Sequence, residues 1–278
     1  MPFKKWYFPA IVLIVLSLAG TACQPLNFVD TLPAHEQKWA FKRDELSALT
    51  IESEYDVNME FIASPDDTNY VEVSGNMQQN TIDQLKETEI TGNTLELPLQ
   101  KDVKLAAPNY KSMKAKVTVA LADETRLQQI SYKADLGNAH FTGLKAKNID
   151  LSVASGNLGA EAVSADRLSL TAKSGDITAD QIQGDADIQL HSGDIRVDGL
   201  KGALTAQSTS GSVSVTGQQS DSLDISVRSG DVTLSPDPEF KGFFDLKTTS
   251  GRITAPESPK KTTDVIKVRT VSGDIRIR

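Results

Sequence analysis

The sequence predicts an all-β protein of the parallel β-solenoid class, with about eight stacked coils of 18–22 residues. Two observations lead to this prediction. Glycines recur at nearly constant spacing along the second half of the chain, and apolar residues alternate with polar ones on both sides of each glycine. The recurring glycines are Gly156, Gly175, Gly193, Gly211, Gly230, Gly251 and Gly273. A repeat this regular describes an architecture rather than an isolated motif.

When the repeats are aligned on their glycine, apolar residues fall in the same places. Two residues after the glycine stand Leu158, Ile177, Ile195, Val213, Val232, Ile253 and Ile275. Five residues before it stand Leu151, Leu170, Ile188, Ala206, Ile225, Leu246 and Val268. One coil cannot bury its own apolar face, so coils stacked about 4.8 Å apart must share an interior. We expect right-handed coiling, because parallel crossovers prefer that hand and no aliphatic residue recurs every six positions.

The glycines are expected to form the corners of the coils, because glycine adopts positive φ at low cost. Small polar residues beside them can bond the backbone of the turn. A calcium site is the alternative, since stacked aspartates offer the oxygen ligands that Ca²⁺ prefers. Only Asp176 and Asp194 form an acidic pair in adjacent coils, and Ser212 and Arg252 interrupt the series. We therefore expect structural turns, with no metal and no cofactor. A phosphate loop is excluded because these glycines lead into strands rather than helices.

Residues 1–22 resemble a secretory signal peptide, with Lys4 and Lys5 before an apolar run at 10–19 that is short for a membrane span. Cys23 is the only cysteine of the chain. Its position resembles the lipobox of bacterial lipoproteins, which implies acylation of Cys23 and a lipid anchor in the cell envelope. The family usually has an aliphatic residue where this chain has Gly20, so cleavage near Ala22 that leaves a free thiol is the alternative. Gln24 implies the outer membrane if the host is Gram-negative.

The mature chain divides into three parts. Residues 23–45 are expected to hold the anchor cysteine and a tether, because the stretch after Cys23 is polar and contains two prolines. Residues 46–130 alternate like strands but do not repeat, so they form either irregular first coils or a separate cap. One short helix is expected at 80–90, with Asn80 or Thr81 as its N-cap. Residues 131–278 form the regular coils.

Charge and composition exclude several function classes. The net charge is −8, and no basic stripe appears, so nucleic acid is not an expected partner. The histidines are His35, His140 and His191, and none has a metal-ligand partner at useful spacing. His191 is expected on the outer face, in solvent. The coils are nearly minimal and leave little chain for a substrate cleft, so we expect no catalytic residues and no enzyme activity.

The serial corners resemble those of the bacterial "putative adhesin" β-solenoid domain, a family of unknown function in secreted and envelope-stress-associated surface proteins. The clear instances are Ser155-Gly156, Ser174-Gly175, Ser192-Gly193 and Ser229-Gly230, and the segment KVTVALADETRLQQISYKADLGNAHF is also similar. The resemblance covers residues 46–278. It implies a solenoid surface on an envelope protein and carries no catalytic residues.

These observations favour a non-enzymatic, lipid-anchored envelope protein that acts as an adhesin or scaffold and binds glycan or protein. Two alternatives stay open: an envelope-stress or signalling accessory, and a carbohydrate-active enzyme on the same scaffold, which a groove with clustered Asp or Arg would favour. The chain finishes inside a strand, so the last coil is expected to be uncovered. Arg276 and Arg278 then either guard that edge or leave it open to self-association.

Overall fold

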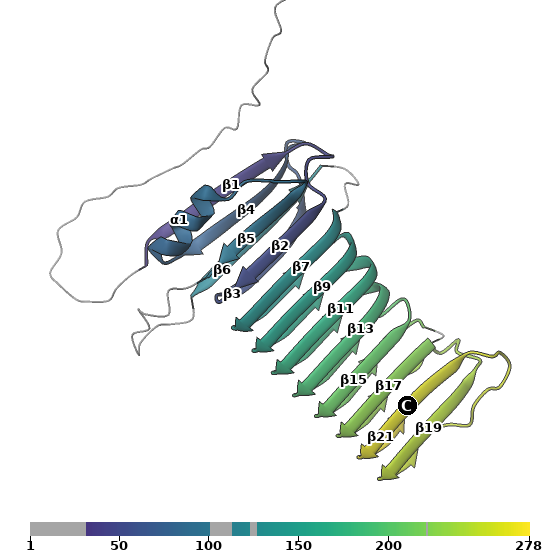
Figure 1. The fold of residues 1–278 in the computed structure, drawn as a ribbon. Helices are drawn as coiled ribbons and strands as arrows, with labels where there is room; N and C mark the ends of the chain where they lie inside the picture. The colour runs from purple at the N-terminus through teal and green to yellow at the C-terminus, as the bar shows by residue number, and fades with distance from the viewer. Residues whose placement is uncertain (1–31, 101–112, 123–126, 221) are drawn as a thin grey trace, which may run out of the picture.

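The protein is described by a computed structural model that covers residues 32–100, 113–122, 127–220 and 222–278. These residues form strands throughout, with one short helix, which confirms the all-β class (Figure 1). The strands alternate between a twelve-stranded sheet A and a ten-stranded sheet B. Among the described residues, no helix has the length and apolarity needed to cross a membrane. The expected signal peptide and Cys23 lie outside the described residues.

From β4 onward, successive strands along the chain belong to sheet A and sheet B in turn. Sheet B contains β2 (Ala48–Ser53), β5 (Thr94–Leu99), β7 (Leu127–Leu136), β9 (Ala146–Ser155), β11 (Ser164–Ser174), β13 (Gln183–Ser192), β15 (Leu204–Ser210), β17 (Ser222–Ser229), β19 (Phe243–Ser250) and β21 (Val265–Ser272). Sheet A contains β1 (Ala34–Phe41), β3 (Asp56–Ala63), β4 (Asn69–Asn76), β6 (Lys114–Leu121), β8 (Ala139–Thr142), β10 (Leu158–Glu161), β12 (Ile177–Asp180), β14 (Ile195–Asp198), β16 (Val213–Thr216), β18 (Val232–Leu234), β20 (Ile253–Thr254) and β22 (Ile275–Ile277). Each regular coil therefore contributes one strand to each sheet.

Equivalent residues of neighbouring coils lie side by side, as the repeat predicts. Ile177 is the parallel register partner of Ile195, and Ile195 is that of Val213. All three side chains are buried. Burying an aliphatic side chain of this size contributes about 1.5–3 kcal/mol, so the interior column stabilises every coil it crosses. The parallel β-solenoid is confirmed.

The order of the coils in space differs from their order along the chain at both ends. At the C-terminal end β21 lies between β17 and β19, and β22 lies between β18 and β20. At the N-terminal end β2 lies between β5 and β7, and β3 lies between β6 and β8. The expectation that the last coil is uncovered is therefore wrong: the last coil is inserted, and β19–β20 forms the outer layer (Figure 1).

The wider spacing of the last corner glycines has a physical reason. From β18 to β19 the chain must pass over one layer, roughly twice the usual 4.8 Å, and then return by one layer to β21. Gly230, Gly251 and Gly273 are further apart than the earlier corner glycines, so the chain has the additional residues that this path needs. Phe240, in the first long connection, is buried and stacks on Phe244 with ring centroids 5.3 Å apart. The connection is thus packed onto the end layer.

The N-terminal part continues the solenoid and closes its end. β2 pairs with β7 and β3 pairs with β8, both in parallel, and one core cluster runs from Trp39 to Ile277. Beyond these layers β4 pairs antiparallel with β6, and β1 pairs antiparallel with β4. Residues 46–130 therefore supply both first coils and a cap on the same core.

Two expectations about this region need correction. The tether was expected to reach residue 45, but Ala34–Phe41 forms strand β1 with Trp39 and Phe41 buried. The helix α1 (Gln79–Glu87) is present, but its N-cap is Gln78 rather than Asn80 or Thr81. Thr81 is instead buried, and its hydroxyl donates to the Gln100 carbonyl at 2.5 Å and lies 2.9 Å from the Tyr55 hydroxyl.

Candidate functional site

The Ser-Gly-Asp corners form a ladder of hydrogen bonds between coils. In each rung, a side-chain Oδ1 at the corner accepts the backbone N–H at the same place in the next layer; the accepting residue follows a glycine in every rung except that of Asp56, which follows Tyr55. The rungs, at 2.8–2.9 Å, are Asp56 to Asn138, Asn138 to Asn157, Asn157 to Asp176, Asp176 to Asp194, Asp194 to Ser212, Asp231 to Asp274 and Asp274 to Arg252. The Asp or Asn at the corner therefore joins one coil to the next.

The corner glycines pack closely against each other. Gly193 has a φ of 128°, and a Cβ placed on it would lie 2.0 Å from the carbonyl oxygen of Gly175. The backbone N–H of Gly193 donates to the Ser210 carbonyl of the next layer at 3.0 Å. Glycine is needed here both for its conformation and because the neighbouring coil occupies the place of a side chain.

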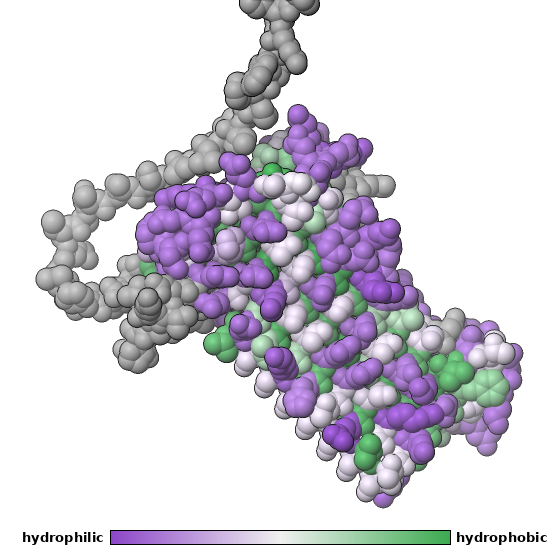
Figure 2. All heavy atoms as spheres, viewed as in Figure 1, coloured by the Kyte–Doolittle hydropathy of each residue, from purple (hydrophilic) through white to green (hydrophobic). Residues whose placement is uncertain are grey.

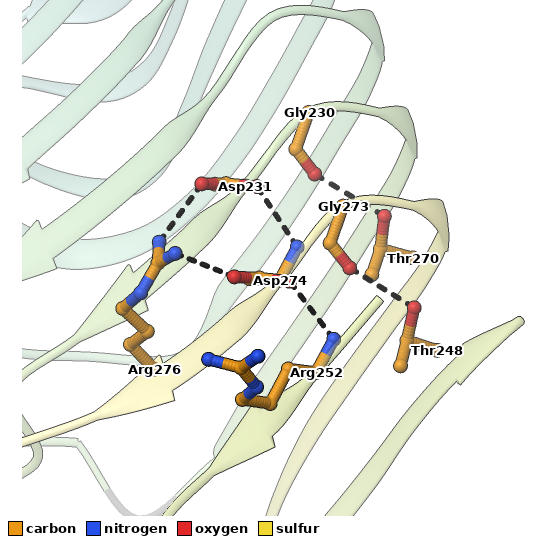
Figure 3. Close-up of polar contacts among 8 residues, drawn as sticks. All are labelled: Gly230, Asp231, Thr248, Arg252, Thr270, Gly273, Asp274 and Arg276. Carbon is orange, nitrogen blue, oxygen red and sulfur yellow. Dashed lines mark hydrogen bonds and ion pairs between the residues drawn. The ribbon is translucent and has the colours of Figure 1, made fainter. Parts of the chain in front are cut away.

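The C-terminal end of the ladder is closed by arginines (Figure 3). The Arg276 guanidinium donates to Asp231 at 2.8 Å and to Asp274 at 2.6 Å. The hydrogen bond from Arg276, and then that from the Asp274 backbone N–H, hold the pKa of the Asp231 carboxyl below its usual value. In the outer layer the acidic residue is replaced by Arg252, whose N–H is the last one that the ladder satisfies. Arg276 therefore stabilises an inner layer rather than guarding the edge.

This geometry assigns the corner carboxylates a structural role. Their Oδ1 atoms already accept backbone N–H groups of the next layer, so this acceptor of each carboxylate is occupied within the protein. Within the described ranges, no group of three or more His, Cys, Asp and Glu side chains is placed to hold a metal ion. The candidate functional site therefore lies on another part of the surface.

A groove of about 640 Å³ crosses the outer face of sheet B next to the corners. Its walls are the outward side chains found four and two residues before each corner glycine, on β11, β13, β15, β17, β21 and β19. Because these six strands are consecutive in the sheet, the groove runs across them for about 24 Å, or five strand spacings. This face of sheet B is turned toward the viewer in Figures 1 and 2. The groove, which we call the sheet B groove, is the candidate functional site.

The sheet B groove is basic in a protein that is acidic overall. Its lining includes four cationic side chains and one histidine: Lys173, Arg228, Lys247, Arg269 and His191. The described residues that line it include no Asp or Glu. The other outward side chains are Thr171, Gln189, Gln207, Thr209, Ser226, Thr249 and the exposed Val271. The groove thus combines positive charge with hydroxyl and amide groups.

Most of these cations have no ionic partner within the described part of the chain. Arg269 pairs with the carboxylate of Asp245, and its guanidinium also donates to the Asp245 carbonyl at 2.6 Å. No described carboxylate forms an ion pair with Lys173, Arg228 or Lys247. Lys247 is moreover the direct register partner of Arg269, so two cations stand on neighbouring strands. Like charges directly opposite each other are destabilising, and Asp245 compensates only the charge of Arg269.

The predicted site residues lie in different places. The corner glycines all have positive φ and line the edge of the sheet, outside the groove. His191 is exposed, as expected, and stands in the groove wall. His140 lies on sheet A, where its Nε2 is 3.6 Å from the Glu161 carboxylate and its ring occupies the space above Gly159. Cys23 lies outside the described residues.

The sequence interpretation missed the sheet B groove. A signal for it exists in the columns four and two residues before the corner glycine, where the cations of β11, β17, β19 and β21 and the histidine of β13 gather. The columns alone do not bring Arg269 beside Ser226, because that contact depends on the insertion of β21 between β17 and β19.

The chain is similar to a family of known proteins over most of its described length. The family model described as Toastrack DUF4097 matches residues 46–278. A "putative lipid binding protein" from Parabacteroides distasonis ATCC 8503 is similar at 17% identity and a TM-score of 0.48, over 87% of this chain and 96% of that chain. A "putative adhesin" from Bacteroides fragilis NCTC 9343 is similar at 15% identity and a TM-score of 0.41, over 88% and 97%. No curated protein matches. The chain belongs to the Toastrack DUF4097 family.

Proposed function

We propose that the protein is a non-enzymatic cell-envelope protein, anchored by lipid at Cys23, that binds a glycan or a protein in the sheet B groove. The observation that supports this proposal is the groove itself, whose lining is basic and free of carboxylates among the described residues. In a chain with a net charge of −8, such a surface is suited to binding an acidic partner.

The rigidity of the groove also favours a binding role. Five of its six strands are hydrogen-bonded to a neighbour on both sides, and β19 is bonded on one side. The backbone that carries these side chains is already fixed, so it loses little conformational entropy when a partner binds. More of the interaction free energy then appears as affinity.

A carbohydrate-active enzyme is the second candidate, because Arg228 and Arg269 stand on the neighbouring strands β17 and β21 in the groove. Glycoside hydrolysis commonly uses a pair of carboxyl groups, one as acid and one as base or nucleophile. The described lining residues contain no carboxyl group, which favours binding over hydrolysis. If acidic or neutral polysaccharides are shortened by the purified protein, the enzyme is favoured instead.

The binding proposal is tested by placing negative charge in the groove. Thr209→Glu with Ser226→Glu should abolish binding of the labelled protein to cell-envelope fractions, because both positions line the groove. The matched control is Ser214→Glu with Thr233→Glu on sheet A, whose side chains are also half-buried and lie outside the groove. Equal loss of binding in both pairs would contradict a groove-specific role.

The anchor is tested separately. Palmitate labelling of the cells should mark the protein, and Cys23→Ala should remove the label and release the protein from the membrane fraction. A Cys23→Ala variant that keeps both the label and the membrane fraction would refute the anchor.

A further inference from the structure

We infer that the ligand of the sheet B groove is a linear acidic polysaccharide, bound through its carboxylate groups along the stacking axis. This inference rests on the proposed binding function and adds the class of ligand. Lys173, Arg228, Lys247 and Arg269 line one groove that crosses six strands. A compact anion would contact one or two of them, whereas an extended polyanion can reach all four.

Arg269 is paired with Asp245, whereas the other three cations of the groove have no carboxylate partner among the described residues. Lys247 and Arg269 are direct register partners, about 4.8 Å apart along the sheet. The carboxylate of Asp245 pairs with Arg269 alone among these cations. Carboxylates placed along the groove would form charge-assisted hydrogen bonds with Lys247 and would add to the pair that Arg269 already makes with Asp245.

The direction of the groove argues against an acidic peptide. An extended peptide usually binds a sheet by adding a strand to a free edge, where its backbone finds partners. The groove instead crosses β11, β13, β15, β17 and β21, whose backbone groups are already paired on both sides. Only side chains are available along most of its length, so the ligand must be recognised by charge and hydroxyl contacts rather than by its backbone.

The uncharged lining points to sugar rather than nucleic acid. Thr171, Gln189, Gln207, Thr209 and Ser226 offer hydroxyl and amide groups, which donate and accept hydrogen bonds as sugar hydroxyls require. Single-stranded nucleic acid is commonly held by stacking of its bases on aromatic rings. The described lining residues include no aromatic ring other than the imidazole of His191.

The test uses the purified protein with polygalacturonate, a linear carboxylated polysaccharide, and with the same polymer after methyl esterification. Polygalacturonate should bind, the neutral ester should not, and binding should weaken as salt is raised. Arg228→Gln with Lys247→Gln should lower the affinity about fivefold, since each exposed charged contact is worth a modest amount. The control, Arg196→Gln with Lys201→Gln, removes two exposed cations that lie outside the groove and should leave the affinity unchanged.

Three results would overturn the inference. They are equal binding of the methyl ester, an equal loss of affinity in the control pair, and equal or tighter binding of polyglutamate, single-stranded DNA or phosphatidylglycerol vesicles. If polygalacturonate fails to bind but the Thr209→Glu and Ser226→Glu pair still abolishes envelope binding, only the ligand class is wrong. If that pair has no effect on envelope binding either, the proposed function fails with it.

Discussion

The two ends of the solenoid are built differently. At the N-terminal end, helix α1 and strands β1 and β4 extend beyond the stacked layers, and Tyr55 and Leu85 are fully buried there. At the C-terminal end the outermost layer is β19–β20, where Phe243 is 39% exposed and Ile253 is 42% exposed. The same repeated interior is thus closed at one end and open at the other.

The two ends also differ in the hydrogen bonds that satisfy their backbone and side-chain polar groups. At the closed end, Gln37 donates to the Leu85 carbonyl at 2.6 Å and Trp39 donates to the Thr88 carbonyl at 2.8 Å, so β1 satisfies the end of α1. At the open end, β20 is only two residues long, and the Ser258 hydroxyl accepts the Phe244 N–H at 2.9 Å. Short strands and local capping are means of protecting an edge. A solenoid can therefore end with a cap or with a shortened, locally capped layer.

The largest expected effect compares a corner glycine inside the stack with one at the open end. Gly193→Ala should destabilise the protein by about 4 kcal/mol, since strain at positive φ adds to a clash with the Gly175 carbonyl. Gly251→Ala meets the Gly273 carbonyl at a similar distance, but its layer has no outer neighbour and can shift. Urea unfolding should show a clearly smaller loss for Gly251→Ala. Equal losses would mean that the open end is as rigid as the middle.

The next comparison concerns the apolar side chains of the two ends. Leu85→Ala should cost about 3 kcal/mol because it leaves a cavity in the closed end, whereas Ile253→Ala should cost less than about 1 kcal/mol because its side chain is partly in solvent. The free energy of unfolding of each variant measures the difference. A cost for Ile253→Ala as large as that for Leu85→Ala would indicate that a partner or another segment covers the open end.

Hydrogen exchange tests the insertion of the last coil. The backbone amides of β21 should exchange about tenfold more slowly than those of β19, although β21 comes later in the chain, because β21 has neighbours on both sides. Faster exchange in β21 than in β19 would mean that the coils stack in chain order and that the inserted arrangement is wrong.

The smallest effect is a dependence on pH at the last corners. The pKa of Asp231 is lower in the folded protein than its usual value, so its ion pair stabilises the fold above the unfolded pKa of about 3.9 and this contribution is lost as the pH falls through the folded value. Asp231→Asn should therefore be less stable than the natural protein at neutral pH. The gap should close in acid, as followed by thermal unfolding at a series of pH values. A difference in stability that stays constant with pH would mean that the Asp231 ion pair does not stabilise the fold.

The repeat made the layers predictable but not their order. Alternating apolar residues and corner glycines determine which residues face the interior and which lie side by side, as Ile177, Ile195 and Val213 show. Leu246 and Val268 occupy the same place in their coils, so either coil would fit next to β17. Only the wider spacing of the last corner glycines signals that the chain passes over a layer.

The N-terminal strand and the groove were missed for a different reason. β1 pairs with β4, although β2 and β3 lie between them along the chain. No sequence repeat indicates that β4 is its partner. The alternation that buries Trp39 and Phe41 is short and follows Pro33. The groove depends on which coils become neighbours. The residue pattern within a single coil does not predict which cations of different coils lie next to each other in the groove.

The inserted last coil also has a consequence for how the protein is made. A chain is synthesised from its N-terminus, so β19 and β20 emerge before the strands that separate them from β17 and β18. The outer layer cannot take its final place until β21 and β22 are available to fill the layer between it and β17–β18. This end of the molecule therefore completes its folding last, after the final two strands of the chain have joined the stack.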